Sequence, residues 1–534
     1  MKTINKIFLK IALFVSMFFL MASCSLKEQI LDTVTATSVQ ADSTLLQNIV
    51  YTPVSQLPIM GEWFDMWGLQ EMCTDEAMWP TRGTDWYDGG AWQQIYTLST
   101  NPQHVQVNNA WNHMSNALTY CNTASGALLT AKTSPALLQR YTGMVDFMRT
   151  YYEYVMYDLW RIFPYRDPKN SDFSVAPTYY TGTAGFNFLV SNAKKAYGEM
   201  ISRDDAPYGE PNKDAALMLL AKLYLNKGVY TGTANYDSCL YYVNQIIATG
   251  HYALANDYFA MFLPNNASRY KAADDEAILV GVNDDTRNHG FDWNNVWVQP
   301  CFHYNQTFNG NYPSNWNGGA ATPFYLRNTW YAGTDTAKDV RWKDNRFYST
   351  TGVYIGFNNG IQHDGQGNII RTRGGAPLNY TDTISLTSSP ENFGVRVLKY
   401  YPRLTGVIPY RINNSWIIWR YADVLLMKAE CLARSTTQQD LQGAMALVNQ
   451  IRAKRNAPLV SATSQADVLN KIYIERGLEL YWEGLRRDDR IRFGTFLNPR
   501  TDFPGTTNTN DYVYPIPQSA IDGSNGALHQ NPGY

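Results

Sequence analysis

The chain has 534 residues, with 44 Lys and Arg against 46 Asp and Glu, which gives a formal net charge of −2 at pH 7. Because there is no basic excess, the composition argues against a nucleic-acid partner. Charged residues make up only 17% of the chain and aromatic residues 14%, so neutral polar groups and tyrosine hydroxyls must cover much of the surface. Such a surface suits neutral, hydroxyl-rich ligands better than phosphates or polyanions.

Residues 1–23 have the features of a bacterial lipoprotein signal peptide. Lysines open the segment, and residues 11–22 form an apolar run that is too short to span a bilayer and has the length of a signal-peptide core. The sequence MASC that follows resembles a lipobox and predicts cleavage before Cys24 and lipidation of that residue. An ordinary secretory signal followed by a chance cysteine is the alternative. The SLKEQ sequence after Cys24 resembles a signal for lipoproteins displayed on the cell surface.

Two long helices are predicted next, over 105–130 and 135–163. In the second, apolar residues recur every three or four positions, which is the spacing of one buried helix face. Ser134 provides an N-cap before Pro135 in the first turn. Pro164 is expected to close the helix.

An internal repeat follows, at an offset of about 205 residues. ALMLLAKLYLNKG from Ala216 leads to VNQII from Val243, and ADVLLMKAECLAR from Ala422 leads to VNQIR from Val448. Each copy has the pattern of two helices joined by a short turn and resembles a tetratricopeptide-type helix pair. Such pairs bury their apolar faces by stacking on one another, which predicts a short solenoid.

Further helices are predicted near 187–201 and 465–490. The last one carries Glu475, Glu479 and Glu483 four positions apart, a spacing at which like charges repel. A catalytic role is one interpretation of these glutamates, but a structural ion-pair network with nearby arginines is favoured. Those arginines are Arg476, Arg486, Arg487 and Arg490.

The region between the two copies, roughly 256–414, loses helical periodicity and is rich in Gly, Asn, Asp and Trp. It is predicted to form loops and short strands inserted into a helical scaffold, and loops on a rigid scaffold are where binding residues gather. Ten of the fifteen tryptophans fall in two windows, 61–95 and 291–345. If the fold brings these windows together, they form an aromatic platform.

A flat aromatic face packs well against the CH face of a sugar ring, while Asp, Asn and Arg side chains can bind its hydroxyls. Covering half a tryptophan removes about 100 Å² of apolar surface, worth about 2.5 kcal/mol. Association costs at least about 4 kcal/mol, so several rings are needed. For every tryptophan here, burial in the protein core is the alternative to ligand contact. Trp86 and Trp316 are the strongest candidates for ligand contact because their polar and glycine neighbours argue against a packed core. The candidate glycan-binding residues are Trp79, Arg82, Asp85, Trp86, Tyr87, Trp293 and Trp316.

Several motifs together resemble the SusD/RagB family, over essentially the whole mature chain. The N-terminal ones are TDEAMWPTRGTDWYDGGAW at 74–92 and WNHMSNALTYCNTA at 111–124. The others are the lipobox, WRYADVLLMKAECLA at 419–433, VNQIRAKRNAP at 448–458, ERGLELYWEGLRRDDRIRFG at 475–494 and the ending YPIPQSAIDGSNGALHQNPGY.

The resemblance implies a mainly α fold, with a scaffold of four tetratricopeptide-like helix pairs and an irregular, loop-rich ligand-binding half. It implies one SusD-like domain over 24–534, with parts at about 24–255, 256–414 and 415–534. It further implies a lipoprotein of Bacteroidetes, anchored in the outer membrane and facing the cell exterior, which caps a SusC-like, TonB-dependent transporter. Such a protein captures oligosaccharides and passes them to the transporter without cutting them, and no cofactor or metal is expected.

Two alternatives stay open. The RagB branch of the family binds peptides in the same capping role, although low-charge, tryptophan-rich loops favour sugar. A surface glycoside hydrolase would need two carboxyl groups about 5–10 Å apart across a substrate. No metal-ligand spacing, nucleophile motif or phosphate-binding loop occurs in the sequence, so a non-enzymatic protein is predicted. The carboxylates that keep hydrolysis open are Asp75, Glu76, Asp274, Asp275 and Glu276.

Overall fold

The computed structural model describes residues 43–170, 175–284, 300–308, 310, 315–404 and 412–534. The predicted signal peptide, the lipidation site Cys24 and the candidate residue Trp293 lie outside these ranges. Within the described ranges, no helix is both long enough and apolar enough to cross a membrane.

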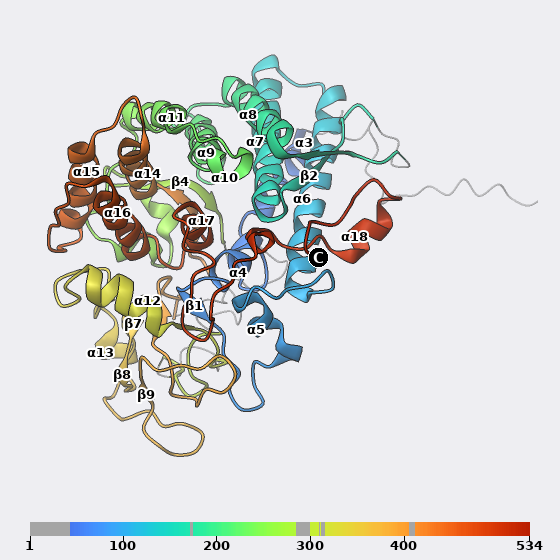
Figure 1. Ribbon diagram of the computed structural model, residues 1–534. Coiled ribbons are helices and arrows are strands. Elements are labelled where there is room, and N and C mark those ends of the chain that lie inside the picture. The colour runs from blue at the N-terminus through green and yellow to red at the C-terminus, as the bar shows by residue number, and fades with distance from the viewer. Residues whose placement is uncertain (1–42, 171–174, 285–299, 309, 311–314, 405–411) are drawn as a thin grey trace, which may run out of the picture.

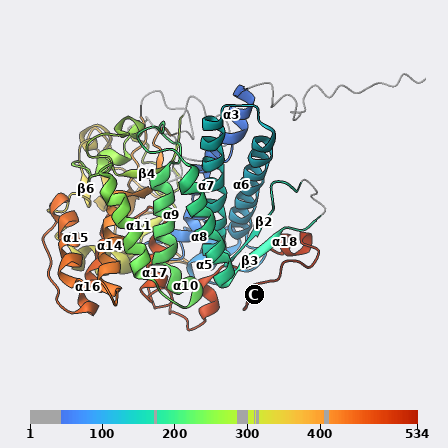
Figure 2. The ribbon, with the colours of Figure 1, turned by 90° about the horizontal axis from the view of Figure 1, so that it is seen from above.

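Eight helices stand in a continuous array in which each helix packs against the next (Figure 1 and Figure 2). Both copies of the predicted repeat form adjacent, packed helices in this array, so the predicted mainly α scaffold is confirmed. The chain leaves the array after the fifth helix and returns at the sixth, and these two helices contact each other directly. In packing order the helices are α6 (Val105–Thr130), α7 (Pro135–Trp160), α8 (Gly182–Glu199), α9 (Lys213–Leu225), α11 (Tyr236–Thr249), α14 (Tyr421–Arg434), α15 (Leu441–Lys454) and α16 (Gln465–Glu479).

Periodicity located the two long helices well but misplaced one of their ends. α6 has the predicted bounds, and Ser134 caps α7 by accepting a hydrogen bond from the Leu137 N–H at 3.3 Å. α7 ends at Trp160, about one turn earlier than predicted, where Arg161 adopts a left-handed conformation with a φ of 59°. The chain then pairs as strand β2 (Ile162–Tyr165) instead of continuing the helix.

Short α-helices, short 3₁₀ and π segments and small antiparallel sheets make up the remaining regular structure. The helices are α3 (Ser43–Tyr51), α4 (Met66–Glu71), α5 (Ala91–Tyr96), α10 (Lys227–Thr231), α12 (Pro323–Tyr325), α13 (Tyr348–Thr351), α17 (Arg486–Arg492) and α18 (Gln518–Gly523). The strand pairs are β1 (Ala77–Met78) with β5 (Ala320–Ala321), β2 with β3 (Thr178–Thr181), β4 (Ala277–Gly281) with β11 (Trp416–Arg420), and β8 (Gly360–Ile361) with β9 (Asn379–Tyr380). One three-stranded sheet has the order β10 (Arg396–Leu398), β7 (Ile355–Asn358), β6 (Lys343–Asp344).

The insert between α11 and α14 agrees with the predicted region of loops and short strands. β4 leads into it and β11 leads out of it, and their pairing holds the two ends of the insert together. β4 contacts α9 and β11 contacts α14, so this pair of strands lies against the helix array. In Figure 1 the insert forms the loop-rich lower part of the molecule, below the helices.

The helix predicted near 465–490 is two helices in the structure. α16 ends at Glu479 and α17 begins at Arg486. Between them, Trp482 and Gly484 have φ angles of 63° and 80°, which a continuous right-handed helix excludes. The prediction is wrong here because contacts with a distant segment of the chain outweigh the local helical pattern.

Two buried carboxyl groups supply those contacts. Glu71 accepts a hydrogen bond from the Gly484 N–H at 2.6 Å, and Glu76 accepts one from the Trp482 N–H. Burial raises the pKa of both groups, that of Glu76 to about 8, because little water remains to solvate a charge. The ring of Trp482 stacks on that of Trp79 with a centroid distance of 6.3 Å. The turn is therefore part of the protein core.

A second buried cluster contains five cations and five carboxylates connected by ion pairs. Glu479 at the end of α16 contacts Arg341, Arg420 and Arg455, with N–O distances of 3.0, 2.7 and 2.8 Å. Burial by itself would raise the pKa of Glu479, but these arginines hold it well below its ordinary value. The other members of this ion-pair network are Arg452, Lys399, Glu276, Glu475, Glu483 and Asp339.

The predicted structural role of Glu475, Glu479 and Glu483 is thus confirmed, but their partners differ from those predicted. The four nearby arginines point to other carboxylates because α16 ends before three of them. Arg476 pairs with Asp423 and Asp489, Arg486 and Arg490 pair with Asp75, and Arg487 pairs with Asp158.

Replacing Glu479 by glutamine should destabilise the protein by about 3–5 kcal/mol, because three buried arginines lose a shared counter-charge. Urea unfolding of the purified protein measures this. The matched control is Asp335→Asn, which breaks an exposed pair with Lys338 and should cost less than about 1 kcal/mol. Similar losses for the two variants would contradict the proposed role of the network.

Replacing Glu76 by glutamine should change how stability depends on pH. The folded protein holds the Glu76 proton more tightly than the unfolded chain, so this group favours folding at low pH, and the contribution fades as the pH rises from about 4.5 toward 8. The stability of Glu76→Gln relative to the native protein should therefore increase by about 1–3 kcal/mol between pH 5 and pH 8. Urea unfolding at both pH values tests this, and parallel pH profiles would show that the group does not titrate.

Candidate functional site

The two tryptophan windows meet because a short sheet joins them. β1 pairs antiparallel with β5, so that Met78 lies opposite Ala320. Trp79 directly follows β1, and Gly319 directly precedes β5. The expectation that the fold brings the windows together is confirmed for the described part of the second window.

Glycine makes this close approach possible. A Cβ atom on Gly319 would lie 2.4 Å from the Trp79 ring, and one on Gly318 would lie 2.5 Å from the Trp86 ring. Both distances are far inside van der Waals contact, so larger residues would push the tryptophans away. These glycines therefore mark tight packing, and the interpretation that glycine neighbours place Trp86 outside a packed core is wrong.

Four tryptophans, two of them partly exposed, form a cluster in this region. The ring centroid of Trp63 lies 5.3, 4.8 and 6.2 Å from those of Trp86, Trp92 and Trp316. The Trp86 indole N–H donates to the backbone carbonyl of Trp316 at 2.7 Å. Edge-to-face and tilted contacts of this kind stabilise aromatic clusters beyond simple burial, so the tryptophans form a rigid base.

Burial separates the predicted site residues into two groups. Trp79, Arg82 and Trp86 are only 2, 2 and 7% exposed, so protein covers their faces, which corrects the prediction that they contact a ligand. Tyr87 is 55% exposed. The remaining described candidates, Asp85 and Trp316, are partly exposed.

Arg82 joins loops and does not reach toward solvent. Its guanidinium donates to the carbonyl of Gly318 at 3.1 Å and to that of Pro390 at 2.6 Å. Burial, with the nearby charge of Arg396 as a second cause, lowers its pKa well below the ordinary value. Arg82 therefore fixes the tryptophan loop against two segments of the insert.

A polar network lies beside the tryptophan cluster. Asp85 accepts hydrogen bonds from the Tyr304 hydroxyl and, at 3.0 Å, from the Arg373 guanidinium. Arg373 lies over the Tyr304 ring, 4.3 Å from its centroid, and pairs with Glu391. The His303 ring contacts Glu391 at 3.0 Å. These contacts hold the Tyr304 ring and the Arg373 guanidinium in fixed orientations.

The contacts of this network shift the pKa values of three of its groups. Burial alone would raise the pKa of Glu391, but hydrogen bonds from His303 and Arg373 lower it to about 2. Burial lowers the pKa of His303, although Glu391 opposes this. Burial and the hydrogen bond to Asp85 raise the pKa of Tyr304. Glu391 is therefore ionised at neutral pH and is held as a hydrogen-bond acceptor by His303 and Arg373.

We call the surface formed by the exposed rings and this polar network the aromatic ledge. Three of its six residues, Trp63, Tyr304 and Arg373, were not predicted from the sequence. Tyr304 lies inside the second tryptophan window, so counting tyrosines together with tryptophans would have found it. Trp63 lies inside the first window, but nothing in its local sequence separates it from buried tryptophans. Arg373 lies in a polar loop, and no feature of the local sequence marks it as a binding residue. The aromatic ledge consists of Trp63, Asp85, Tyr87, Tyr304, Trp316 and Arg373.

The carboxylates that kept glycoside hydrolysis open have structural partners. Asp75, Asp275 and Glu276 are all nearly fully buried in ion pairs with arginines. Glu76 binds the Trp482 turn, and Asp274 pairs with Arg269 at 2.8 Å. In the part of the chain that the structure describes, no three or more His, Cys, Asp or Glu side chains are arranged to hold a metal ion.

An array of helix pairs carrying an aromatic, hydrogen-bonding ledge defines a class of ligand-binding scaffold, and comparison with known proteins identifies the family. The model of the SusD family matches residues 275–534. The chain is also 24% identical over 501 residues to the starch-binding protein SusD of Bacteroides thetaiotaomicron, covering 87% of this chain and 84% of that protein. The chain therefore belongs to the SusD family, as the sequence motifs predicted.

Further relatives agree. A SusD-like protein, P38, of Formosa agariphila is 35% identical over 122 residues, which are 21% of this chain and 23% of that protein. The fold is similar to that of a SusD superfamily protein from Parabacteroides distasonis, with a TM-score of 0.70, 17% identity, and coverage of 94% of this chain and 100% of that one. It is also similar to surface glycan-binding protein A from Bacteroides thetaiotaomicron in complex with laminarihexaose, with a TM-score of 0.67, 19% identity, and coverage of 92% and 99%.

Replacing Gly319 by alanine should destabilise the protein by about 1–3 kcal/mol, because the added methyl group overlaps the Trp79 ring. Chemical unfolding measures the loss. Gly198→Ala is the control, since a Cβ atom there meets open space on α8 and should be neutral or stabilising by up to about 1 kcal/mol. Unchanged stability of Gly319→Ala would refute the tight contact.

Proposed function

We propose that the protein is a cell-surface, lipid-anchored glycan-binding protein that captures oligosaccharides on the aromatic ledge. It passes them to a SusC-like, TonB-dependent transporter in the outer membrane, which it caps. The single observation that carries the proposal is the ledge itself, where exposed aromatic faces lie beside fixed hydrogen-bonding groups. Membership of the SusD family and the lipobox at Cys24 support the surface location and the transporter partner.

The energetics of the ledge suit a sugar chain better than a single sugar. Each half-covered aromatic ring contributes about 2.5 kcal/mol, and association costs at least about 4 kcal/mol. Tyr87, Tyr304 and Trp316 together contribute about 7.5 kcal/mol and exceed that cost by about 3.5 kcal/mol, which corresponds to a Kd of roughly millimolar. The ligand therefore has to span several rings.

The charges of the ledge favour a neutral glycan. Arg373 lies between the carboxylates Asp85 and Glu391, so there is no cationic excess to attract a uronic-acid or sulfated chain. The relatives named for starch and for laminarihexaose suggest neutral glucans as the first ligands to test. A non-enzymatic role is supported by the same geometry, because Asp75, Asp274, Asp275 and Glu276 are held in ion pairs and Glu76 binds the Trp482 backbone.

Replacing Trp316 by alanine should weaken glycan binding roughly tenfold or more, because a stacking face is lost, without unfolding the protein. The hydrogen bond from Trp86 is kept, since it uses the Trp316 backbone carbonyl. Affinity gel electrophoresis and calorimetry against starch, laminarin and a panel of plant, fungal and host polysaccharides measure the effect. Trp86→Ala should instead cost about 3–5 kcal/mol of stability, as for a core aromatic residue.

The control is Tyr241→Ala, which removes a 62% exposed aromatic side chain on α11, outside the ledge, and should leave affinity unchanged. Equal binding by Trp316→Ala and the native protein would overturn the site assignment. Binding of a peptide pool, with no response to any glycan, would assign the capping role to peptide uptake.

A further inference from the structure

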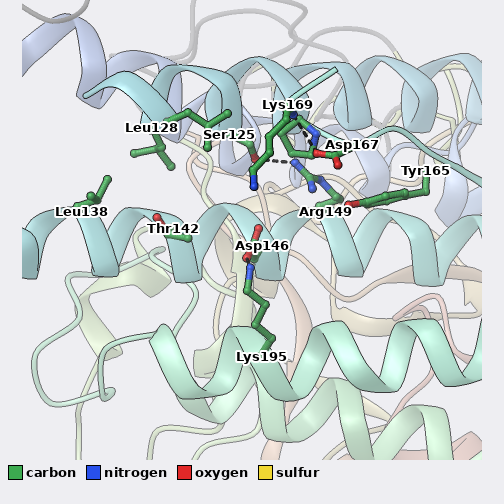
Figure 3. A pocket seen from close by; sticks show the side chains of 12 residues that line it. Ser125, Leu128, Leu138, Thr142, Asp146, Arg149, Tyr165, Asp167, Lys169 and Lys195 are labelled. Atoms are coloured by element: carbon green, nitrogen blue, oxygen red, sulfur yellow. Dashed lines mark hydrogen bonds and ion pairs between the residues drawn. The ribbon is translucent and has the colours of Figure 1, made fainter. Parts of the chain in front are cut away.

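A cavity lies on the helix array, far from the aromatic ledge. It has a volume of about 460 Å³ and lies between α6, α7 and α8, beneath the loop at 165–169 (Figure 3). Its volume falls within the range of small-molecule sites, roughly 300–1,000 Å³. The Gln106 end of α6 contacts the ledge residue Trp63. Ser125 in the cavity lies nineteen positions further along the same helix, which corresponds to about 28 Å.

The two ends of the cavity differ in chemistry. Leucines from the end of α6 and the start of α7 line one end, while charged groups and the Tyr165 ring line the other (Figure 3). The leucine end includes Leu129, which is 55% exposed. An apolar end next to a polar end suits an amphipathic molecule. The leucines are Leu128, Leu129 and Leu138.

Arg149 is a buried cation in this cavity, and it lacks a counter-charge among the described residues. Its side chain is 7% exposed, and it donates one hydrogen bond, at 2.5 Å, to the uncharged Ser125 hydroxyl. No carboxylate of the described residues lies within ion-pairing distance of it, and its Nε has no hydrogen-bond partner there. A buried guanidinium is costly unless a charge or hydrogen bonds compensate for its lost hydration.

The neighbouring carboxyl groups are engaged elsewhere or uncharged. Asp146 pairs with Lys195 at 2.5 Å, and Asp167 accepts the backbone N–H of Lys169 at 2.9 Å. Glu153, one turn beyond Arg149 on α7, is buried, and burial raises its pKa to about 8 against the effect of Arg149. The carboxyl is therefore largely protonated at neutral pH. The place beside Arg149 thus suits a single anionic group brought by a ligand.

We propose that this cavity binds an aliphatic carboxylate, with the carboxylate on Arg149 and Ser125 and the chain along the leucines. A free medium-chain acid and the C-terminus of a peptide with aliphatic residues share this chemistry. The site is independent of the aromatic ledge, so glycan binding and carboxylate binding can each be present without the other.

Calorimetry with octanoate tests the site on the chain from Ser25 onward, which retains every helix, strand and ion pair described above. One octanoate should bind per chain, while octanamide and octanol should bind at least tenfold more weakly because they carry no charge for Arg149. N-acetyl-Leu-Leu tests the peptide source, and tighter binding of this compound than of octanoate would identify a peptide end as the ligand. Failure of both carboxylates to bind, or equal binding of octanamide, would overturn the proposal.

Arg149→Met should weaken octanoate binding at least tenfold without lowering the thermal unfolding midpoint, because an uncompensated buried charge is removed. A purely structural arginine would instead lower that midpoint and leave the affinity unchanged. Arg140→Met is the matched control, since Arg140 lies on the same helix but pairs with Glu210 outside the cavity. This variant should bind octanoate normally.

Thr142→Phe places a large side chain in the cavity and leaves Arg149 unchanged. This variant should also lose octanoate binding, and normal binding would place octanoate elsewhere.

Discussion

The buried ion pairs around Glu479 are the interaction on which the rest of the structure depends. Glu276 lies at the start of β4, Arg420 ends β11, Arg455 follows α15 and Arg341 belongs to the insert. These charges could not be buried separately, because each would carry an uncompensated desolvation cost. Their mutual pairing therefore joins the insert to the helix array at the point where the insert leaves the array and returns to it.

The same core positions the aromatic ledge, the proposed ligand-binding surface. The turn between α16 and α17 is held by Glu71 and Glu76, and Glu76 directly precedes β1. β1 then pairs with β5 and brings Trp316 to the tryptophan loop. A ligand-binding surface gains from such support, since a fixed arrangement of rings and hydrogen-bonding groups loses less conformational entropy when a ligand binds. The aromatic ledge is thus built on rigid contacts although almost all of it is loop.

Local sequence patterns correctly predicted the features that depend on neighbouring residues alone. The helix repeat, the Ser134 cap and the loop-rich insert all follow from apolar spacing and from residues that end or start helices. Patterns failed where distant segments compete with them. The helix predicted near 465–490 breaks because Glu71 and Glu76 bind the backbone of its central turn. Loops carry no periodicity, and the polar and glycine neighbours shared by Trp86 and Trp316 did not separate the buried Trp86 from the partly exposed Trp316.

The sequence by itself therefore determined the mainly α scaffold of helix pairs, the family, and the two segments that supply the aromatic site. Only the tertiary structure decided which rings stay exposed, because two glycines let Trp79 and Trp86 pack closely beside β5 while Tyr87 stays exposed. Tertiary structure also brought Arg373 and Tyr304 to Asp85 from more than 200 residues away. Side-chain burial and long-range pairing are properties of the packed chain, and no local pattern of residues specifies them.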